Sequence, residues 1–218
     1  MKQSSASLGV LRGEFFLLFN SKQLPNHPNG YPTMRKLTVF NQISLDGRFT
    51  DAKGDMSWAH KRDDEWNAFA SSNASGDAAL LFGRVTYEMM KAFWPTPQAA
   101  QQMPEVAAGM NRMPKYVVSR TLGAADWQNT TVLKGDLVTD IQALKATDGP
   151  DVVILGSGSV VSQLTGAGLI DEYQLVLTAT ALGAGRTPFQ TLADRRTFSL
   201  KKTRSFTNGN VVLWYEPA

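Results

Sequence analysis

The apolar positions of this chain follow two alternating patterns as far as about residue 170. Short, dense apolar runs have the length and composition of buried strands, and between them apolar residues recur at the spacing of amphipathic helices. Strands are therefore predicted at 36–44, 78–82, 116–119, 130–133, 151–155 and 173–179. Helices are predicted at 61–72, 86–93, 103–113 and 160–167, with a further helix that Asp136 caps.

Strands dominate the remainder of the chain. The segments 197–206 and 211–215 flank Asn208-Gly209, a dipeptide typical of a tight hairpin. The earlier alternation of strands and helices predicts parallel pairing, because a crossover helix returns the chain to the same edge of the sheet. We therefore expect a single α/β domain, in which helices flank a central, mostly parallel mixed sheet of about eight strands that ends in an antiparallel C-terminal hairpin.

The first 33 residues differ from the rest of the chain. The apolar run from Phe15 to Phe19 is too short for a secretory signal, and a breaker-rich segment follows between Pro25 and Pro32. The first convincing strand begins just after Met34. We expect an N-terminal extension and linker over residues 1–33 and a folded domain over residues 34–218, with a translation start at Met34 as an alternative.

Composition narrows the range of functions. The chain has 218 residues, enough for one domain, and it contains no Cys and two His, which excludes disulfide scaffolds and zinc sites built from Cys or several His. The net charge is +3, but no run of Lys and Arg exceeds two residues, which favours small anionic ligands over nucleic acid. No apolar stretch reaches the roughly 18 residues that span a bilayer. We expect a cytoplasmic protein that binds no metal, membrane or nucleic acid.

The most informative segment follows the predicted strand 151–155. Here Gly156-Ser157-Gly158-Ser159-Val160 leads from a buried strand directly into a helix. Glycines let a ligand approach the backbone, and a helix N-terminus offers unpaired N–H groups and a positive dipole. A phosphate or pyrophosphate is the expected occupant, and a tight turn without a ligand is the alternative. The Rossmann fingerprint is incomplete, because Val161 stands where its third glycine would be.

Two further strand ends carry groups that bind anions. Gly83 and Arg84 precede Thr86 at the start of a helix, and Ser119 and Arg120 end the strand 116–119. Taken singly, Thr86 is equally typical of a helix cap, Arg84 of a solvated surface and Ser119-Arg120 of a polar loop. Because the carboxyl ends of parallel strands share one edge, the three ends together predict a dinucleotide site. Two Arg suit a dinucleotide with an extra phosphate.

In order and spacing, five short motifs resemble the dihydrofolate reductase superfamily. The resemblance is strongest to stand-alone relatives of the C-terminal reductase domain of riboflavin biosynthesis (RibD), and it covers Met34 to about Glu216. The motifs are Ile43-Ser44-Leu45-Asp46-Gly47, Gly83-Arg84-Val85-Thr86-Tyr87, Ser119-Arg120, Gly156-Ser157-Gly158 and Gly183-Ala184-Gly185-Arg186.

This resemblance implies a reductase that uses NADPH. Hydride transfer would reduce a C=N or C=O carbon of a small heterocycle of the pterin or ribosylaminopyrimidine type. The resemblance also points to a homodimer. By position, Gly83, Arg84 and Thr86 would hold the cofactor phosphates, Ser119 and Arg120 the adenosine ribose and its 2′-phosphate, and residues 156–160 the pyrophosphate and nicotinamide.

The expected catalytic carboxylate is Asp63 or Asp64. Dihydrofolate reductases place an acidic residue about five positions after a Trp, and Asp63 follows Trp58 at that spacing, with Asp64 one position later. A carboxylate there would orient a pterin-like ring. The alternative is that both Asp lie in the first turn of a helix, where the dipole favours them. The expected substrate contacts are Leu45, Asp46 and Trp58, although the turn that contains Asp46 also has a purely structural interpretation.

The chain departs from both families. Dihydrofolate reductases lack the Ser-Leu-Asp-Gly turn, and riboflavin reductases usually carry another sequence in place of Gly-Arg-Val-Thr-Tyr. A second hypothesis is therefore a dinucleotide-binding regulatory protein without catalysis on the same fold. A substrate cavity beside the nicotinamide position distinguishes the two, since the binding protein requires Leu45, Trp58 and the Asp63 region to fill that space.

Overall fold

A central sheet of eight strands organises the computed structural model, which describes residues 34–59 and 63–218. The strands are β1 (Leu37–Ser44), β2 (Ala79–Gly83), β3 (Lys115–Val118), β4 (Thr130–Leu133), β5 (Val152–Leu155), β6 (Glu172–Thr178), β7 (Phe198–Ser205) and β8 (Val211–Pro217). Their order in the sheet is β4-β3-β2-β5-β1-β6-β8-β7. The first six in this order pair in parallel, and β8 and β7 continue the sheet antiparallel.

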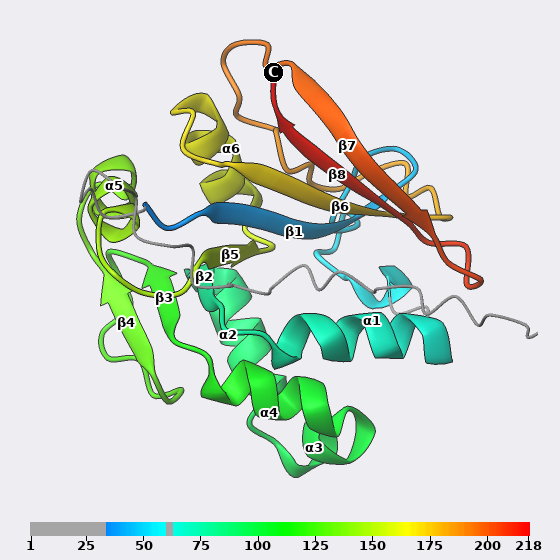
Figure 1. Cartoon of the computed structure of the whole chain (residues 1–218), viewed down its shortest axis with the longest axis horizontal. Coiled ribbons are helices and arrows are strands. Elements are labelled where there is room, and N and C mark those ends of the chain that lie inside the picture. Colours follow the sequence, from blue (N-terminus) through cyan, green and yellow to red (C-terminus); the bar gives the residue numbers. More distant parts are fainter. Residues whose placement is uncertain (1–33, 60–62) are drawn as a thin grey trace, which may run out of the picture.

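Helices cover both faces of the parallel part of the sheet (Figure 1). They are α1 (Asp64–Ser75), α2 (Arg84–Phe93), α3 (Pro97–Gln102), α4 (Pro104–Arg112), α5 (Leu137–Lys145) and α6 (Gly158–Gly166), with a 3₁₀ turn at Ser57–Ala59. Helices α5 and α6 pack their apolar side chains on one face, and α1, α2 and α4 pack theirs on the other. Strands β2 and β5 are therefore buried on both sides, which explains their continuous apolar sequences.

The expected fold class is confirmed, including the antiparallel C-terminal strands, which turn at Asn208-Gly209 with a positive φ at Gly209. Helix boundaries were predicted less well. The first helix begins at Asp64 rather than at 61, because Asp63 caps it, and residues 60–62 lie outside the described part. Helix α2 begins at Arg84 instead of Thr86, directly at the end of its strand. Helix α3 was not expected; Thr96 caps it and Pro97 occupies its first position.

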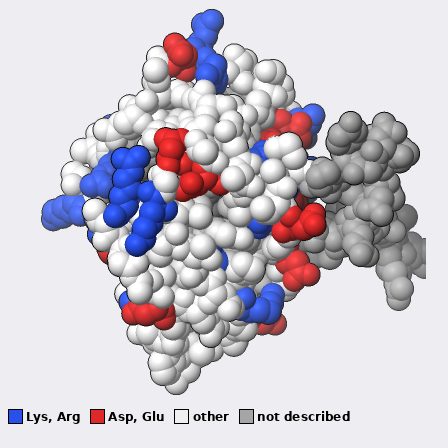
Figure 2. Space-filling view, turned by 90° about the vertical axis from the view of Figure 1, so that its left-hand side faces the viewer, with Lys and Arg blue, Asp and Glu red and all other residues white. Residues whose placement is uncertain are grey.

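Helix lengths and the distribution of surface charge can be compared with the composition of the chain. In the part of the chain that the structure describes, no helix has both the length and the apolar character needed to cross a membrane. On the face shown in Figure 2, Lys and Arg side chains form small groups with Asp and Glu side chains nearby. The positive net charge is therefore not gathered into one continuous surface on this face. The extension proposed for residues 1–33 lies outside the described residues.

Helices α1 and α4 approach each other closely at Gly109. A Cβ atom on Gly109 would lie 2.2 Å from the carbonyl oxygen of Ala74, at the C-terminal end of α1. Glycine is a poor helix former, so its presence inside α4 is explained by this contact rather than by helix propensity.

We predict that Gly109→Ala destabilises the domain by about 1–3 kcal/mol, although alanine favours a helix by about 1 kcal/mol, because the two backbones must separate. Urea unfolding of the variant and the wild type measures the difference. Ala108→Gly is the matched control: Ala108 is exposed on the same helix, and its replacement should cost only the propensity term of about 1 kcal/mol. A Gly109→Ala variant as stable as the wild type would contradict this account of the packing.

Candidate functional site

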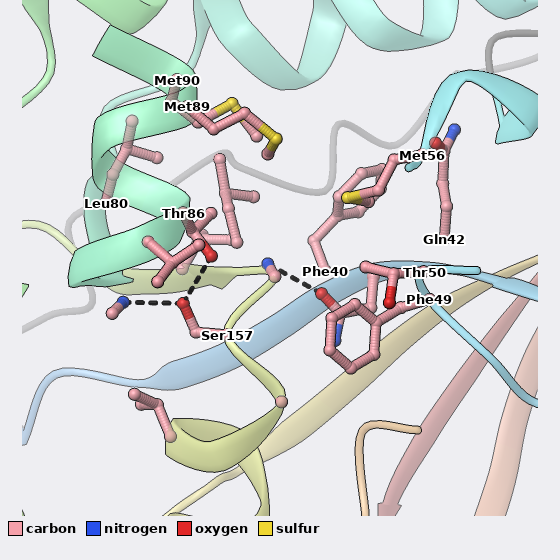
Figure 3. Close-up of a pocket in the computed structure, with 18 of the residues that line it drawn as sticks. Phe40, Gln42, Phe49, Thr50, Met56, Leu80, Thr86, Met89, Met90 and Ser157 are labelled. Atoms are coloured by element: carbon pink, nitrogen blue, oxygen red, sulfur yellow. Dashed lines mark hydrogen bonds between the residues drawn. The ribbon is translucent and has the colours of Figure 1, made fainter. Parts of the chain in front are cut away.

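A groove of about 1450 Å³ runs along the carboxyl ends of the parallel strands. Because these strands point the same way, the segments that follow β2, β3, β4 and β5 all reach this edge. The groove brings together every residue expected to bind the cofactor: Gly83, Arg84, Thr86, Ser119, Arg120, Gly156, Ser157, Gly158, Ser159 and Val160. Figure 3 shows part of its lining, with α2 on one side and β1 on the other.

Ser157 joins the two glycine-containing turns. Its Oγ accepts the backbone N–H of Gly83 at 2.7 Å and donates to Thr86 Oγ1 at 2.9 Å (Figure 3). On the other side, Asn41 Oδ1 accepts the N–H of Gly156 at 2.8 Å. Gly156 and Ser157 both have left-handed backbone conformations, with φ of 63° and 60°. The turn after β5 is thus fixed to the start of α2 and to β1.

The two helices that begin at these turns have no side-chain caps. Gly83 and Ser157 are the N-cap residues of α2 and α6, and neither forms a capping bond from its side chain. Helices α1, α3 and α5 are each capped by an Asp or Thr side chain, whereas α4 also has no side-chain cap. The interpretation of Thr86 as a cap of its own helix is wrong, since its hydroxyl bonds Ser157 instead. Two positive helix ends therefore face the groove, as an anion site requires.

Close contacts explain why glycine stands at three of these positions. A Cβ on Gly158 would lie 2.5 Å from Cε1 of the Phe49 ring, which packs against this residue. A Cβ on Gly83 would lie 3.0 Å from Ser157 Oγ, and one on Gly156 3.1 Å from Thr86. The glycines thus let three segments meet at the floor of the groove. Phe49 was not among the expected site residues.

The two expected phosphate-binding arginines differ in their partners. Arg84 forms an exposed pair with Glu88, with Nη1 at 2.9 Å from both carboxylate oxygens. Arg120 is exposed and forms no salt bridge with the described residues. It lies near Asp136, whose pKa is lowered mainly by the N–H of Thr139 and to a smaller extent by Arg120. Exposed pairs such as Arg84–Glu88 are weak, so both guanidinium groups can be recruited by a phosphate.

Ser119, which precedes Arg120, is buried. Its hydroxyl oxygen accepts the backbone N–H groups of Thr121 at 3.2 Å and Leu122 at 2.9 Å. These bonds fix the backbone of the loop after β3, and with it the position from which the Arg120 side chain extends.

Beyond the glycine turns, the groove opens into an apolar cavity. It is lined by Phe40 from β1, by Met89 and Met90 from α2 and by Met56 from the loop after β1 (Figure 3). Trp66 from α1 also lines it. Gln42 places a neutral amide group at the same end. Six methionines line the whole groove: Met56, Met89, Met90, Met103, Met110 and Met113. The sequence analysis did not predict this methionine lining. The Met89-Met90 pair, which begins three residues after Thr86, could have indicated it.

The expected catalytic carboxylates lie elsewhere. Asp63 is the N-cap of α1: its Oδ1 accepts the N–H of Trp66 at 2.7 Å, and its Oδ2 accepts the hydroxyl of Thr207 at 2.9 Å. Asp64 is exposed in the first turn of the helix. Neither residue lines the groove. The observed geometry is that of the alternative, in which the two carboxylates stabilise the helix start.

The expected substrate contacts are also outside the groove lining. Leu45 is 61% exposed, and the Trp58 indole N–H donates to the Asp55 carbonyl at 3.2 Å. Asp46 accepts the backbone N–H groups of Leu182 and Gly183 at 3.0 and 2.9 Å. These bonds, led by that from Leu182, hold the pKa of Asp46 well below its usual range. Asp46 therefore joins two loops, which corresponds to the structural role that was the alternative to substrate contact.

The donor set of the groove does not suit a metal. Among residues 34–59 and 63–218, no cluster of three or more His, Cys, Asp or Glu has a geometry that could hold an ion. Most of its polar groups are hydroxyls, amides, backbone N–H groups and guanidinium groups, and its charged lining also includes Lys53, Asp55 and Asp136.

Comparison with known proteins agrees with the expected resemblance. The sequence model of the RibD C-terminal domain family matches residues 35–212. The uncharacterized protein YyaP of Bacillus subtilis (strain 168) is 24% identical over 181 residues, which are 83% of this chain and 94% of YyaP.

Solved structures of other proteins share the fold. A putative riboflavin biosynthesis protein from Shewanella sp. PV-4 matches with a TM-score of 0.64 at 24% identity, over 84% of this chain and 99% of that chain. Dihydrofolate reductase from Enterococcus faecalis, complexed with NADP(H), matches with a TM-score of 0.56 at 14% identity, over 84% of this chain and 96% of that chain. The dihydrofolate-reductase-like fold is thereby confirmed.

We predict that Ser157→Ala lowers the free energy of unfolding by about 1–3 kcal/mol, because the N–H of Gly83 loses its acceptor inside the protein. Urea unfolding provides the measurement. Ser159→Ala serves as the control, since Ser159 is exposed two positions away and its loss should change stability by less than about 0.5 kcal/mol. Equal stabilities of the two variants would show that Ser157 does not hold the turns together.

Proposed function

Because the chain belongs to the family of RibD C-terminal domains, we propose that it is an NADPH-dependent reductase acting on a small heterocyclic substrate. The observation that carries this proposal is the continuity of the groove. The anion-binding turns after β2, β3 and β5 line one end, and an apolar cavity beside β1 lies at the other. A dinucleotide at the turns would thus bring its reactive base to a space where a substrate fits.

The residues present fit NADPH. Two uncapped helix ends and the close-packed glycines form a cradle for its pyrophosphate, which Gly83, Arg84, Thr86 and residues 156–160 would hold. Ser119 and Arg120 would meet the adenosine ribose and its 2′-phosphate, at the far end of the same groove. The fold shared with a dihydrofolate reductase complexed with NADP(H) supports this assignment.

Bound NADPH would supply a hydride for a C=N or C=O carbon of the substrate. The chain's own residues would orient the two molecules and exclude water, through the aromatic and methionine side chains of the cavity. Methionine side chains adapt to ligands of different shape. Asp63 receives no role in proton transfer, since its carboxylate is bonded to Trp66 and Thr207 outside the groove.

The alternative, a regulatory protein that only binds a dinucleotide, is less well supported. It requires Leu45, Trp58 and the Asp63 region to fill the space beside the nicotinamide position. Of the described residues, neither Leu45, Trp58 nor Asp63 lines the groove, which favours a reductase over a protein that only binds the dinucleotide. Oxidation of NADPH in the presence of dihydrofolate or a ribosylaminopyrimidine is the direct test of catalysis.

The location we propose is the cytoplasm, in keeping with a chain that has no Cys.

We predict that Arg120→Ala weakens NADPH binding roughly ten- to a hundredfold and leaves NADH binding nearly unchanged, because only NADPH carries the 2′-phosphate. Arg84→Ala should weaken both cofactors. Calorimetric titration of each variant with NADPH and NADH gives the four affinities. Arg195→Ala is the control, since this exposed arginine lies outside the groove. Unchanged NADPH affinity in both groove variants would remove the main physical support for the reductase.

We further propose a homodimer that covers the sheet face of β6, β8 and β7. On this face Leu177, Leu213 and Tyr215 are partly exposed, and Leu200 is 52% exposed. Apolar side chains in this number on one sheet face are typical of an interface.

Leu200→Lys should shift the protein towards monomer at micromolar concentration, because the new charge would be buried in the interface. Ser199→Lys is the control: this neighbouring residue of β7 is exposed, and its side chain points to the other face. Sedimentation velocity distinguishes the two species. A wild-type protein that sediments as a monomer would refute the dimer.

A further inference from the structure

Two buried polar groups of the groove lack a hydrogen-bond partner. Among the described residues, several buried side-chain nitrogen and oxygen atoms have no partner, and those that belong to groove-lining residues are Asn41 Nδ2 and Thr50 Oγ1. An unpaired buried donor or acceptor is costly, so each such group in a native protein needs an explanation. One explanation is a ligand in the groove that supplies the missing hydrogen-bond partners.

The orientation of Asn41 is fixed by its neighbour. The residue is 3% exposed in the middle of β1, and its Oδ1 accepts the N–H of Gly156 at 2.8 Å. The same amide group therefore presents its two N–H donors away from the Gly156 turn. Asn41 thus offers the groove a donor whose direction is set before any ligand binds.

Thr50 lies on the same side of the groove. It is 7% exposed, and its backbone forms a bridge with Arg186 that holds it in place. Phe49, which precedes it, packs against Gly158. Figure 3 shows Thr50 and Phe49 next to the strand that carries Asn41. A fixed amide donor and a fixed hydroxyl therefore lie on the β1 side of the glycine turn.

The order of the strands indicates which part of a dinucleotide reaches this point. Along the sheet edge, the loop of Arg120 after β3 comes first, then the turns after β2 and β5, and then β1. With the adenosine end at Arg120 and the pyrophosphate at the turns, the other base of the dinucleotide lies at β1. The nicotinamide ring carries a carboxamide, which has one carbonyl acceptor and one N–H₂ donor.

We propose that Asn41 and Thr50 bind the nicotinamide carboxamide. Asn41 Nδ2 donates to the carboxamide oxygen, and Thr50 Oγ1 accepts one of its N–H bonds. The two residues position the ring so that one of its faces is turned to the apolar cavity of Phe40 and Met56. This inference rests on the proposed use of NADPH. Neither Asn41 nor Thr50 belongs to the five sequence motifs on which the family resemblance is based.

The test compares NADPH with 2′-phospho-ADP-ribose, which has the same phosphates and adenosine but no nicotinamide. Thr50→Val removes the hydroxyl and keeps the shape. It should weaken NADPH binding about three- to tenfold in calorimetric titration and leave 2′-phospho-ADP-ribose within twofold. The melting temperature of the free protein should not fall, because an unpaired buried hydroxyl has been replaced by a methyl group.

Thr178→Val is the matched control. Thr178 is fully buried, its hydroxyl is also unpaired, and it does not line the groove. This variant should bind both ligands as the wild type does. Asn41→Asp provides the second arm: it keeps the oxygen that accepts the Gly156 N–H and removes the amide donor. At pH 9 it should lose at least tenfold in NADPH affinity and less than threefold in affinity for 2′-phospho-ADP-ribose.

The outcomes separate this inference from the proposed function. Unchanged NADPH affinity in Thr50→Val and Asn41→Asp, while the wild type binds both ligands, overturns the carboxamide site alone. An equal loss for both ligands also overturns it, since the two residues would then act through the Gly156 turn. A wild-type protein that binds neither ligand overturns the use of NADPH itself, and the carboxamide site with it.

Discussion

The site depends on one hydroxyl group that joins two turns far apart in the sequence. Ser157 Oγ accepts the N–H of Gly83 and donates to Thr86, across 74 and 71 positions of the chain. Without it, the N-termini of α2 and α6 would be separate helix ends. With it, and with Asn41 holding Gly156, they form one rigid surface of N–H groups. A surface fixed in advance binds an anion without an ordering cost at the time of binding.

The same arrangement explains the choice of residues around it. The segments meet so closely that a Cβ at position 158 would overlap the ring of Phe49, and one at position 83 would crowd Ser157. Buried strands β2 and β5 carry the turns to the groove, and helices on both faces hold those strands. Side-chain caps are present at α1, α3 and α5 and absent at α2, α4 and α6. At α2 and α6, the N-terminal N–H groups are thus left for a ligand expected in the groove.

The other half of the groove has a different chemistry. Its aromatic and methionine side chains come from β1, α1 and α2 and from the loop after β1, and they leave a wide apolar space. The loop after β1 is tied to the segment 182–186 through Asp46 and the bridge of Thr50 with Arg186. Asp46 thus shapes the wall of the cavity without lining it. Apolar contact would dominate the binding of a substrate here, while Gln42 offers a neutral amide and Lys53 and Asp55 of the loop after β1 offer charged groups.

The sequence by itself determined the sheet, its direction and the place of the glycine-containing turns. These features are written in local patterns: continuous apolar runs at 78–82 and 151–155, glycines directly after them, and Asn208-Gly209 between two strands. Local patterns suffice because parallel topology sends all such strand ends to one edge. Only the tertiary structure decided which side chains face the groove. Asp63 turns to Thr207, 144 positions away, and Phe49 packs on Gly158 rather than on a neighbour in the sequence. Such contacts depend on where a helix begins to within one residue and on how distant loops meet, and neither leaves a signal in the spacing of residues along the chain.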